Sequence, residues 1–203
     1  MQGLYAVTPN WDDTALLLTA TEEIIRGGAR MVQYRHKDID AATRQVQASA
    51  LQQLCRDYLV PFIINDDVDL CIELNADGIH VGGTDAPIAD VRQRVGANKI
   101  VGASCYGSMD LARVAVHDGA SYVAFGGFYP SLVKKYEVST SPDIVAQAKA
   151  ELDVPVVVIG GMTVDNCGIL IAQGADMVAA ISSIYARTNR KKAAQEMSDL
   201  FSH

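Results

Sequence analysis

One short pattern occurs four times in this chain of 203 residues and constrains its fold more than any other feature. Each copy has Gly or Asn, then Ala, two spacer residues and a β-branched apolar residue. The copies are GARMV at 28–32, NADGI at 75–79, GASYV at 119–123 and GADMV at 174–178. We expect the Gly or Asn to end a helix in the left-handed conformation. The alanine then lets the chain pass closely beneath the next layer, so each copy predicts a step from a helix into a strand.

Four further apolar runs lie between these copies, at residues 4–7, 62–64, 100–103 and 154–159. Eight strands result, and helical patterns separate most of them. Apolar strands that alternate with helices are typical of a parallel sheet covered by helices. The sequence therefore predicts a (β/α)₈ TIM barrel in a single compact domain over residues 1–203. A doubly wound open sheet is the alternative.

The helical patterns also predict which faces are buried. In the first helix Ala15, Leu18, Ile24 and Ile25 share one face. In the second helix the expected face is formed by Val46, Ala50, Leu51, Leu54 and Tyr58.

Composition narrows the function classes. Apolar residues make up 49% of the chain, which argues against disorder. The net charge of −7 and the absence of a basic run argue against nucleic acid as a partner. An anionic ligand would have to be bound by a few well-placed groups, because the overall field repels it.

The sequence also indicates a compartment. The spacing of the four cysteines, Cys55, Cys71, Cys105 and Cys167, matches no zinc or redox pattern and suits reduced, buried thiols. No signal peptide is recognised at the N-terminus, and no apolar stretch approaches the roughly 20 residues of a membrane helix. We expect a cytoplasmic protein without a membrane partner, as a monomer or small homo-oligomer.

Polar residues follow nearly every predicted strand. They include residues 33–37 (QYRHK), 65–67 (NDD), His80, Asp85, 104–106 (SCY), 126–135, Gly160-Gly161 and Ser182-Ser183. In a barrel of this type the carboxyl ends of all strands meet at one mouth, where chemistry takes place. The pattern therefore predicts an active site at that mouth.

The last two of these segments favour a phosphate site. Gly160-Gly161 lets the backbone approach a ligand closely, and Ser182-Ser183 falls where a final helix begins with free N–H groups. The alternative is a tight turn followed by an ordinary serine N-cap.

Asp66 and Asp85 follow adjacent strands and suit Mg²⁺, which is usually held by one or two carboxylates together with substrate phosphates. The alternative for each is a helix N-cap, for which Asp67 is the better candidate. Arg35, Lys37 and Lys134 would add positive charge suited to a diphosphate. From the residue pattern alone, we assign no catalytic role to the histidines that follow these strands.

These motifs, in this order, resemble those of the thiamine phosphate synthase family over nearly the whole chain. Residues 33–37 match its Q-x-R-x-K motif, and Asn65-Asp66 matches N-D. Residues 77–82 followed by Asp85 match D-G-(V/I)-H-(L/V)-G-x-x-D. GAS at 102–104 and IGG at 159–161 match G-x-S and I-G-G.

The resemblance implies the same barrel and a transferase reaction. That reaction joins 4-amino-2-methyl-5-hydroxymethylpyrimidine diphosphate to a 4-methyl-5-hydroxyethylthiazole phosphate and releases pyrophosphate. The pyrimidine diphosphate would be held by Gln33, Tyr34, Arg35, His36, Lys37, Asn65, Ser104 and Lys134. Of these residues, Arg35, Lys37, Lys134 and Ser104 would be catalytic. Mg²⁺ would bind Asp66 and Asp85, and the thiazole phosphate would bind Ser131, Val133, Gly161, Ile181 and Ser182.

One segment departs from the family pattern F-P-T-x-T-K. Residues 129–134 read YPSLVK, so Ser131 keeps a hydroxyl whereas Val133 has none. The loss of one hydrogen bond to a charged group weakens binding by roughly 1.5–3 kcal/mol.

The resemblance also implies ionisation of the pyrimidine before the thiazole attacks, with Mg²⁺ and the cationic side chains stabilising the departing pyrophosphate. Two other functions on the same fold remain as alternatives. One is a thiazole tautomerase, which would need no diphosphate, and the other is a non-catalytic sensor of a phosphorylated ligand.

Overall fold

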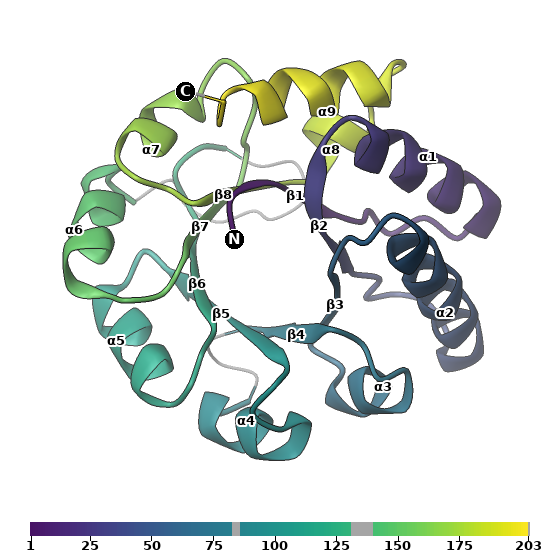
Figure 1. Cartoon of the computed structure of the whole chain (residues 1–203), viewed down its shortest axis with the longest axis horizontal. Helices are drawn as coiled ribbons and strands as arrows, with labels where there is room; N and C mark the ends of the chain where they lie inside the picture. Colours follow the sequence, from purple (N-terminus) through teal and green to yellow (C-terminus); the bar gives the residue numbers. More distant parts are fainter. Residues whose placement is uncertain (83–85, 131–139, 203) are drawn as a thin grey trace.

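Eight parallel strands close into a barrel in the computed structural model of this chain, which describes residues 1–82, 86–130 and 140–202. The strands follow the order of the sequence, β1 through β8, and β8 pairs with β1 (Figure 1). The predicted (β/α)₈ barrel is confirmed, and this last pairing excludes an open sheet. Helices surround the barrel, and the N-terminus lies over its opening in this view.

The strands are β1 (Gly3–Val7), β2 (Ala29–Tyr34), β3 (Phe62–Asn65), β4 (Gly78–Val81), β5 (Ile100–Tyr106), β6 (Tyr122–Phe125), β7 (Val156–Ile159) and β8 (Met177–Ala180). The helices are α1 (Thr14–Arg26), α2 (Ala41–Asp57), α3 (Val68–Glu73), α4 (Ile88–Val95), α5 (Met109–His117), α6 (Asp143–Glu151), α7 (Gly168–Ala172), α8 (Ser182–Tyr185) and α9 (Arg190–Asp199).

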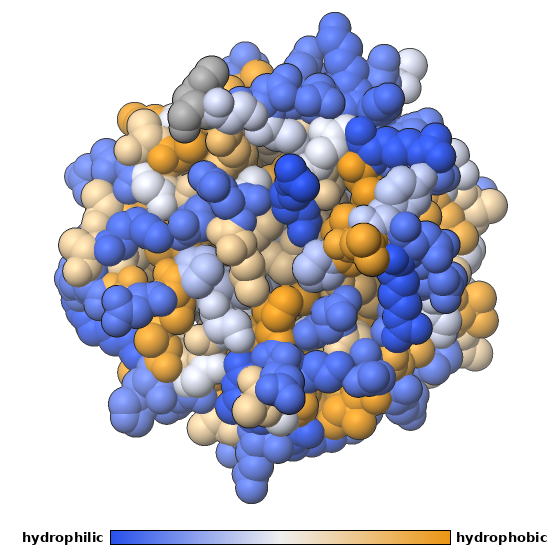
Figure 2. Space-filling model, in the orientation of Figure 1, coloured by the Kyte–Doolittle hydropathy of each residue, from blue (hydrophilic) through white to orange (hydrophobic). Residues whose placement is uncertain are grey.

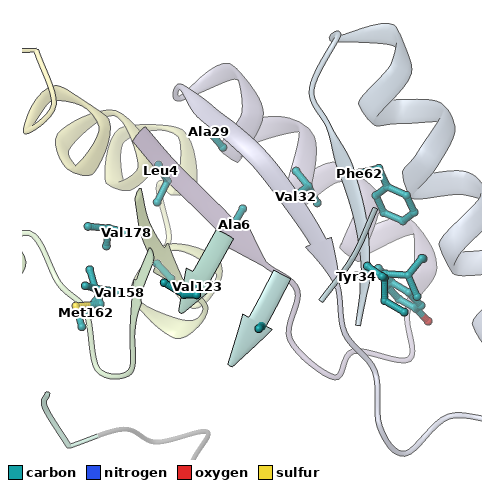
Figure 3. Packing of buried hydrophobic residues seen from close by; sticks show 14 of the residues in the cluster. Leu4, Ala6, Ala29, Val32, Tyr34, Phe62, Val123, Val158, Met162 and Val178 are labelled. Carbon is teal, nitrogen blue, oxygen red and sulfur yellow. The ribbon is translucent and has the colours of Figure 1, made fainter. Parts of the chain in front are cut away.

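Each strand buries both of its faces. Alternate residues point outward and pack against the helices, as Leu4, Ala6 and Val32 do in Figure 3. The residues between them fill the barrel interior, where Tyr5 and Met31 belong to a second, smaller apolar cluster. This explains why the strands appear in the sequence as continuous apolar runs.

The repeated pattern ends helices as the sequence predicts. Its first residue has a positive φ in all four copies: 104° at Gly28, 49° at Asn75, 97° at Gly119 and 103° at Gly174. In the third copy the N–H of Gly119 bonds to the carbonyl of Val116, and that of Ala120 bonds to the carbonyl of Ala115. This pair of bonds is a Schellman motif.

The same bonds recur around Asn75 and Gly174. The alanines that follow the first residue are all buried, as the close approach of two layers requires; they are Ala29, Ala76, Ala120 and Ala175.

A further regularity lies in the third residue of the pattern. Asp77, Ser121 and Asp176 each accept a hydrogen bond from the backbone N–H of the first or second residue of a neighbouring strand. The donors are Phe62 (2.8 Å), Val101 (3.0 Å) and Val156 (2.7 Å), respectively. Each of these copies therefore ends a helix and also joins the beginnings of two adjacent strands.

The predicted face of α2 is partly wrong. Val46 is exposed, whereas Gln47 and Gln52 are buried. The amide of Gln47 donates to the carbonyl oxygens of Trp11 (3.0 Å) and Asp12 (3.1 Å) and accepts from the hydroxyl of Tyr34 (3.0 Å). Satisfied hydrogen bonds make this burial favourable, and they rotate the helix away from the orientation that apolar spacing predicts.

The surface seen in Figure 2 carries hydrophilic side chains interspersed with apolar ones. Within residues 1–82, 86–130 and 140–202, no helix is long and apolar enough to span a membrane. All four cysteines are free and buried, and burial raises the pKa of the Cys55 thiol to about 12.

The left-handed helix ends lead to a test of stability. Ala at position 174 would carry a side chain at a φ of 103°, with its Cβ 3.0 Å from Cγ of Lys149. We expect Gly174→Ala to lower the free energy of unfolding by about 1–2 kcal/mol in urea denaturation. Gly168→Ala is the matched control, because no atom lies within 4 Å of its Cβ and its φ is not positive. Equal stability of the two variants would contradict this account of the repeat.

Candidate active site

The alternation of side chains along the strands selects which predicted site residues face the barrel axis. Met31 of β2 belongs to the interior cluster, so Gln33 and then Arg35 continue on the same side. By the same rule Ile63 is followed by Asn65, and Ala179 by Ile181. Gln33 is buried and Ser104 on β5 is partly buried. These predicted residues therefore converge on the carboxyl ends of the strands.

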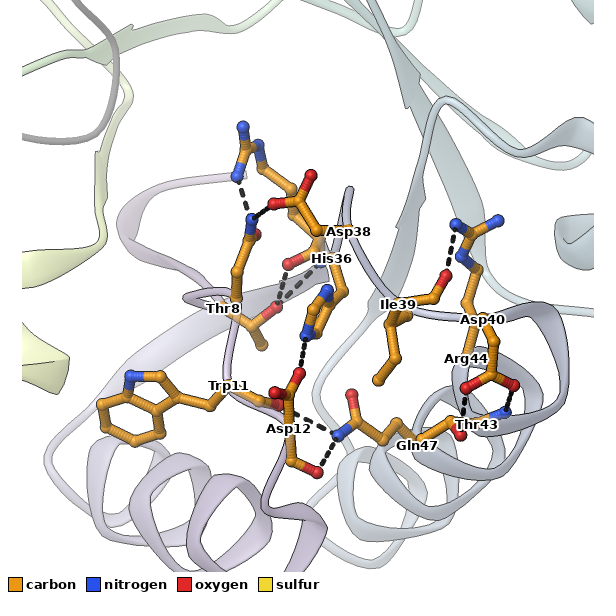
Figure 4. A network of polar contacts seen from close by, with 12 residues as sticks. Thr8, Trp11, Asp12, His36, Asp38, Ile39, Asp40, Thr43, Arg44 and Gln47 are labelled. Atoms are coloured by element: carbon orange, nitrogen blue, oxygen red, sulfur yellow. Dashed lines mark hydrogen bonds and ion pairs between the residues drawn. The ribbon is translucent and has the colours of Figure 1, made fainter.

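Arg35 is held at this mouth by the chain that leaves β1. The hydroxyl of buried Thr8 accepts from the N–H of Arg35 (2.8 Å) and donates to its carbonyl (3.1 Å). The guanidinium Nη1 donates to Oδ1 of Asn10 (3.1 Å), whose own amide donates to Asp38 (2.7 Å) (Figure 4). Both the backbone and the side chain of Arg35 are therefore oriented before any ligand binds.

Tyr34 and His36 lie on the opposite, helix-facing side of the same segment. Tyr34 packs in the outer apolar cluster. The His36 side chain is 2% exposed, its Nε2 lies 3.2 Å from Oδ1 of Asp12, and its Nδ1 has no hydrogen-bond partner among the described residues. This arrangement favours a supporting role for both residues, in which they fix the loop that carries Arg35.

A carboxylate and a cation meet beside β3. Oδ2 of Asp66 lies 3.4 Å from Nζ of Lys37 and accepts from Nδ2 of Asn65 (2.7 Å). Its Oδ1 accepts from the N–H of Gly82 after β4 (3.3 Å). Asp66 has a φ of 61°, a conformation that non-glycine residues rarely adopt outside tight turns and functional sites.

The Asp66 carboxylate is of the kind that holds Mg²⁺, which is usually bound by one or two carboxylates together with substrate phosphates. Asp67, the next residue, instead accepts from the N–H of Leu70 (3.0 Å) and caps α3, as the sequence predicts. Asp85, the predicted second ligand, lies outside the described residues, as do Ser131, Val133 and Lys134. No group of three His, Cys, Asp or Glu side chains that could hold a metal occurs in the described part of the chain.

A cavity of about 360 Å³ opens over β7 and β8. Gly160 and Gly161 line it with φ values of 101° and 66°. A Cβ on Gly161 would lie 2.3 Å from the carbonyl oxygen of Pro130, so glycine is required there. Ile181 and Ser182 form the opposite wall. The first amides of α8 have no partner within the helix and favour an anion.

Three contributors to this cavity were missed by the sequence reasoning. Arg187 and Thr163 line it, and Asn166 holds the glycine turn by donating to the carbonyl of Gly161 (2.9 Å) and accepting from the N–H of Thr163 (2.8 Å). The available signal was that Arg187 lies only two residues after α8, close in sequence to Ser182 and Ser183.

The closed parallel barrel and the polar groups at the carboxyl ends of its strands define the class of protein: a (β/α)₈-barrel enzyme with a pocket suited to phosphate. Residues 4–184 match the family model of thiamine monophosphate synthase. The chain therefore belongs to the thiamine monophosphate synthase family, and its activity is that of a transferase in thiamine biosynthesis.

Individual relatives agree. A thiamine-phosphate synthase of Janthinobacterium sp. (strain Marseille) is 60% identical over 99% of this chain and 97% of its own length. One from Nitrosospira multiformis is 43% identical over 98% and 85%. The thiamine phosphate pyrophosphorylase of Pyrococcus furiosus superposes with a TM-score of 0.86 at 28% identity, covering 99% of this chain and 96% of that one.

The Thr8 hydroxyl provides a test of the site's support. Thr8→Val leaves the buried N–H and carbonyl of Arg35 without their side-chain partner, so we expect the free energy of unfolding to fall by about 1–3 kcal/mol. Thr8→Ser keeps the hydroxyl and is the matched control. Urea denaturation measures both. If the valine variant is as stable as the serine variant, the hydroxyl does not hold Arg35.

Proposed function

We propose that this chain couples 4-amino-2-methyl-5-hydroxymethylpyrimidine diphosphate with 4-methyl-5-(2-phosphoethyl)thiazole or its carboxylated precursor. The products are thiamine monophosphate and pyrophosphate, and carbon dioxide is released as well when the carboxylated precursor reacts. One observation supports the proposal in addition to family membership: two groups of residues lie at the same barrel mouth. The first is the anion pocket over β7 and β8, and the second is formed by Arg35, Lys37 and Asp66. The proposal assigns each of the two phosphorylated substrates to its own part of this mouth.

The pyrimidine diphosphate is assigned to the β2, β3 and β5 side of the mouth. Arg35 presents a preoriented guanidinium, and Lys37 adds a mobile charge with its side chain 53% exposed. Gln33, Asn65 and Ser104 are assigned to the pyrimidine or the first phosphate. Lys134 is assigned to the diphosphate by its sequence position alone.

Asp66 and Asp85 are the residues that would hold Mg²⁺. When bound, the ion supplies positive charge against the diphosphate oxygens. The ion pair with Lys37 supports this assignment, because the Asp66 carboxylate faces a cation in this position.

The thiazole phosphate is assigned to the cavity over β7 and β8. Gly161, Ile181 and Ser182 offer backbone at close range, and Arg187 adds a positive charge. Ser131 and Val133 are assigned to the same phosphate by sequence position alone. The absence of a hydroxyl at Val133 is then offset at least in part by Arg187, since a guanidinium binds phosphate with more than one N–H.

The protein contributes to this reaction by electrostatic stabilisation of the leaving group. The bond from the pyrimidine methylene carbon to the diphosphate oxygen breaks, and pyrophosphate leaves with the electron pair. The thiazole nitrogen then donates its lone pair to the same carbon and forms the C–N bond. Arg35, Lys37 and Lys134 stabilise the charge on the departing oxygens. No protein nucleophile takes part.

A coupling assay tests the function directly. Both substrates are mixed with the enzyme, with and without Mg²⁺, and thiamine monophosphate and pyrophosphate are quantified. We expect product only when both substrates and the metal are present. Consumption of a thiazole substrate alone would favour a tautomerase, and binding without turnover would favour a sensor.

The cytoplasmic location and the monomeric or small homo-oligomeric state remain predictions from the sequence.

The carboxylate of Asp66 is tested by charge removal. We expect Asp66→Asn to lower kcat/KM at least about 100-fold at limiting Mg²⁺, with part of the loss recovered at high Mg²⁺, because a lost ligand weakens metal binding. Asp69→Asn, an exposed position on α3, is the matched control, since its ion pair with Arg94 contributes little. If both variants depend on Mg²⁺ as the unchanged enzyme does, Asp66 is not a ligand.

The glycine turn is tested by a single methyl group. Gly161→Ala places a Cβ against the carbonyl of Pro130, and the turn has to move. We expect the KM for the thiazole phosphate to rise about tenfold, which corresponds to about 1.4 kcal/mol, while the KM for the pyrimidine diphosphate stays unchanged. Steady-state kinetics separate the two constants. A rise in both would show that the turn acts on the fold rather than on one subsite.

A further inference from the structure

Five side chains inside the barrel form one continuous chain of hydrogen bonds. Nε2 of Gln33 donates to the hydroxyl of Tyr5 (2.7 Å), which lies 2.9 Å from the hydroxyl of Tyr122. That hydroxyl lies 2.9 Å from Nδ1 of His80, and Nε2 of His80 lies 2.9 Å from Oγ of Ser104. The chain begins and ends at residues assigned to the pyrimidine, so it links two sides of one pocket.

The centre of this chain is built around a glycine. A Cβ on Gly102 would lie 2.0 Å from Cζ of Tyr122, so only glycine leaves room for the phenol in the interior. The Tyr122 ring stacks on His80 with 5.6 Å between centroids and meets Tyr5 edge-on. The aromatic rings are therefore held on several sides, which fixes the position of each hydroxyl.

The direction of the hydrogen bonds follows from counting protons. Burial raises the pKa of Tyr5 and of Tyr122 far above the neutral range, so each phenol keeps its one proton. Tyr5 already accepts from Gln33, so its own proton points to Tyr122, and the proton of Tyr122 then points to Nδ1 of His80. With the Gln33 amide in this orientation, the opposite direction would leave the buried Tyr5 proton without an acceptor, which is costly.

This direction determines what each end of the chain offers to a ligand. With Nδ1 accepting, the His80 ring carries its proton on Nε2 and donates to Ser104. The Ser104 hydroxyl then uses its own proton toward the pocket. At the other end, one N–H of Gln33 Nε2 is used by Tyr5, and the carbonyl oxygen of the same amide is left to accept from a ligand. Rotating the Gln33 amide would require every bond in the chain to reverse.

We propose that Tyr5, Tyr122 and His80 are positioning residues that make Gln33 a hydrogen-bond acceptor and Ser104 a donor, and thereby select a pyrimidine with an exocyclic amino group. The inference rests on the proposed function for the identity of the ligand. An amino group donates, and a ring nitrogen of the same heterocycle accepts, which complements the two ends of the chain. The 4-oxo counterpart has an accepting exocyclic oxygen and a donating ring N–H, so it presents the reverse pattern.

The proton position on His80 is the first test and needs no substrate. Nitrogen-15 spectra of histidine-labelled protein distinguish the protonated ring nitrogen, and His80→Gln assigns its signals among the four histidines. We expect the proton on Nε2 in the unchanged protein and a mixture of the two tautomers in Tyr122→Phe. A proton on Nδ1 in the unchanged protein, or a spectrum that Tyr122→Phe does not alter, would overturn the proposal.

Ligand selection is the second test. The affinities of the 4-amino pyrimidine diphosphate and its 4-oxo counterpart are measured by calorimetry without the thiazole partner. We expect the unchanged protein to prefer the amino compound, and Tyr122→Phe and Tyr5→Phe each to reduce that preference at least about tenfold. Tyr185→Phe is the matched control, because it removes a buried hydroxyl that bonds to Thr21 outside the barrel interior.

The two tests separate failure of this inference from failure of the proposed function. An equal preference in Tyr122→Phe and Tyr185→Phe overturns the positioning role, even if the coupling reaction proceeds. If neither pyrimidine binds, the proposed function fails, and the tautomer of His80 still decides the direction of the chain.

Discussion

Pairing of β8 with β1 is the constraint on which the rest of this structure depends. It gives every strand two neighbours, removes both sheet edges and brings the carboxyl ends of eight strands to a single mouth. Without that closure, the cavity over β7 and β8 and the cationic group beside β2 and β3 would not lie at the same opening. Side chains such as Asp77 and Asp176 secure the opposite end of the barrel by bonding to the first N–H groups of neighbouring strands.

Closure also divides each strand into two environments. Outward strand residues are apolar and meet the helices, and the buried amide of Gln47 on α2 is satisfied there by the hydroxyl of Tyr34 on β2. Inward residues form an apolar layer that gives way, toward the mouth, to polar groups that are bonded to one another. The chain from Gln33 to Ser104 is stable in the interior because each member has a partner, and Gly102 supplies the space for it.

The same arrangement resolves an apparent conflict in the charges. A chain with net charge −7 is poorly suited to bind anions through its overall field. The mouth instead concentrates Arg35 and Lys37 with amides from the glycine turn and α8, and Asp66 is one of the acids that balance them. Local geometry, rather than total charge, determines which ligands can be held.

The number of strands, the left-handed helix ends at Gly28, Asn75, Gly119 and Gly174, and the gathering of polar residues after the strands could all be predicted from the sequence. Each depends on local conformation or on short-range periodicity. Which side of a strand a residue faces required the tertiary structure. Tyr34 and His36 alternate with Gln33 and Arg35, and closure turns the first pair toward the helices and the second pair toward the axis. The face of α2 and the hydrogen-bond chain through Tyr5, Tyr122 and His80 likewise depend on partners distant in sequence, which no local pattern specifies.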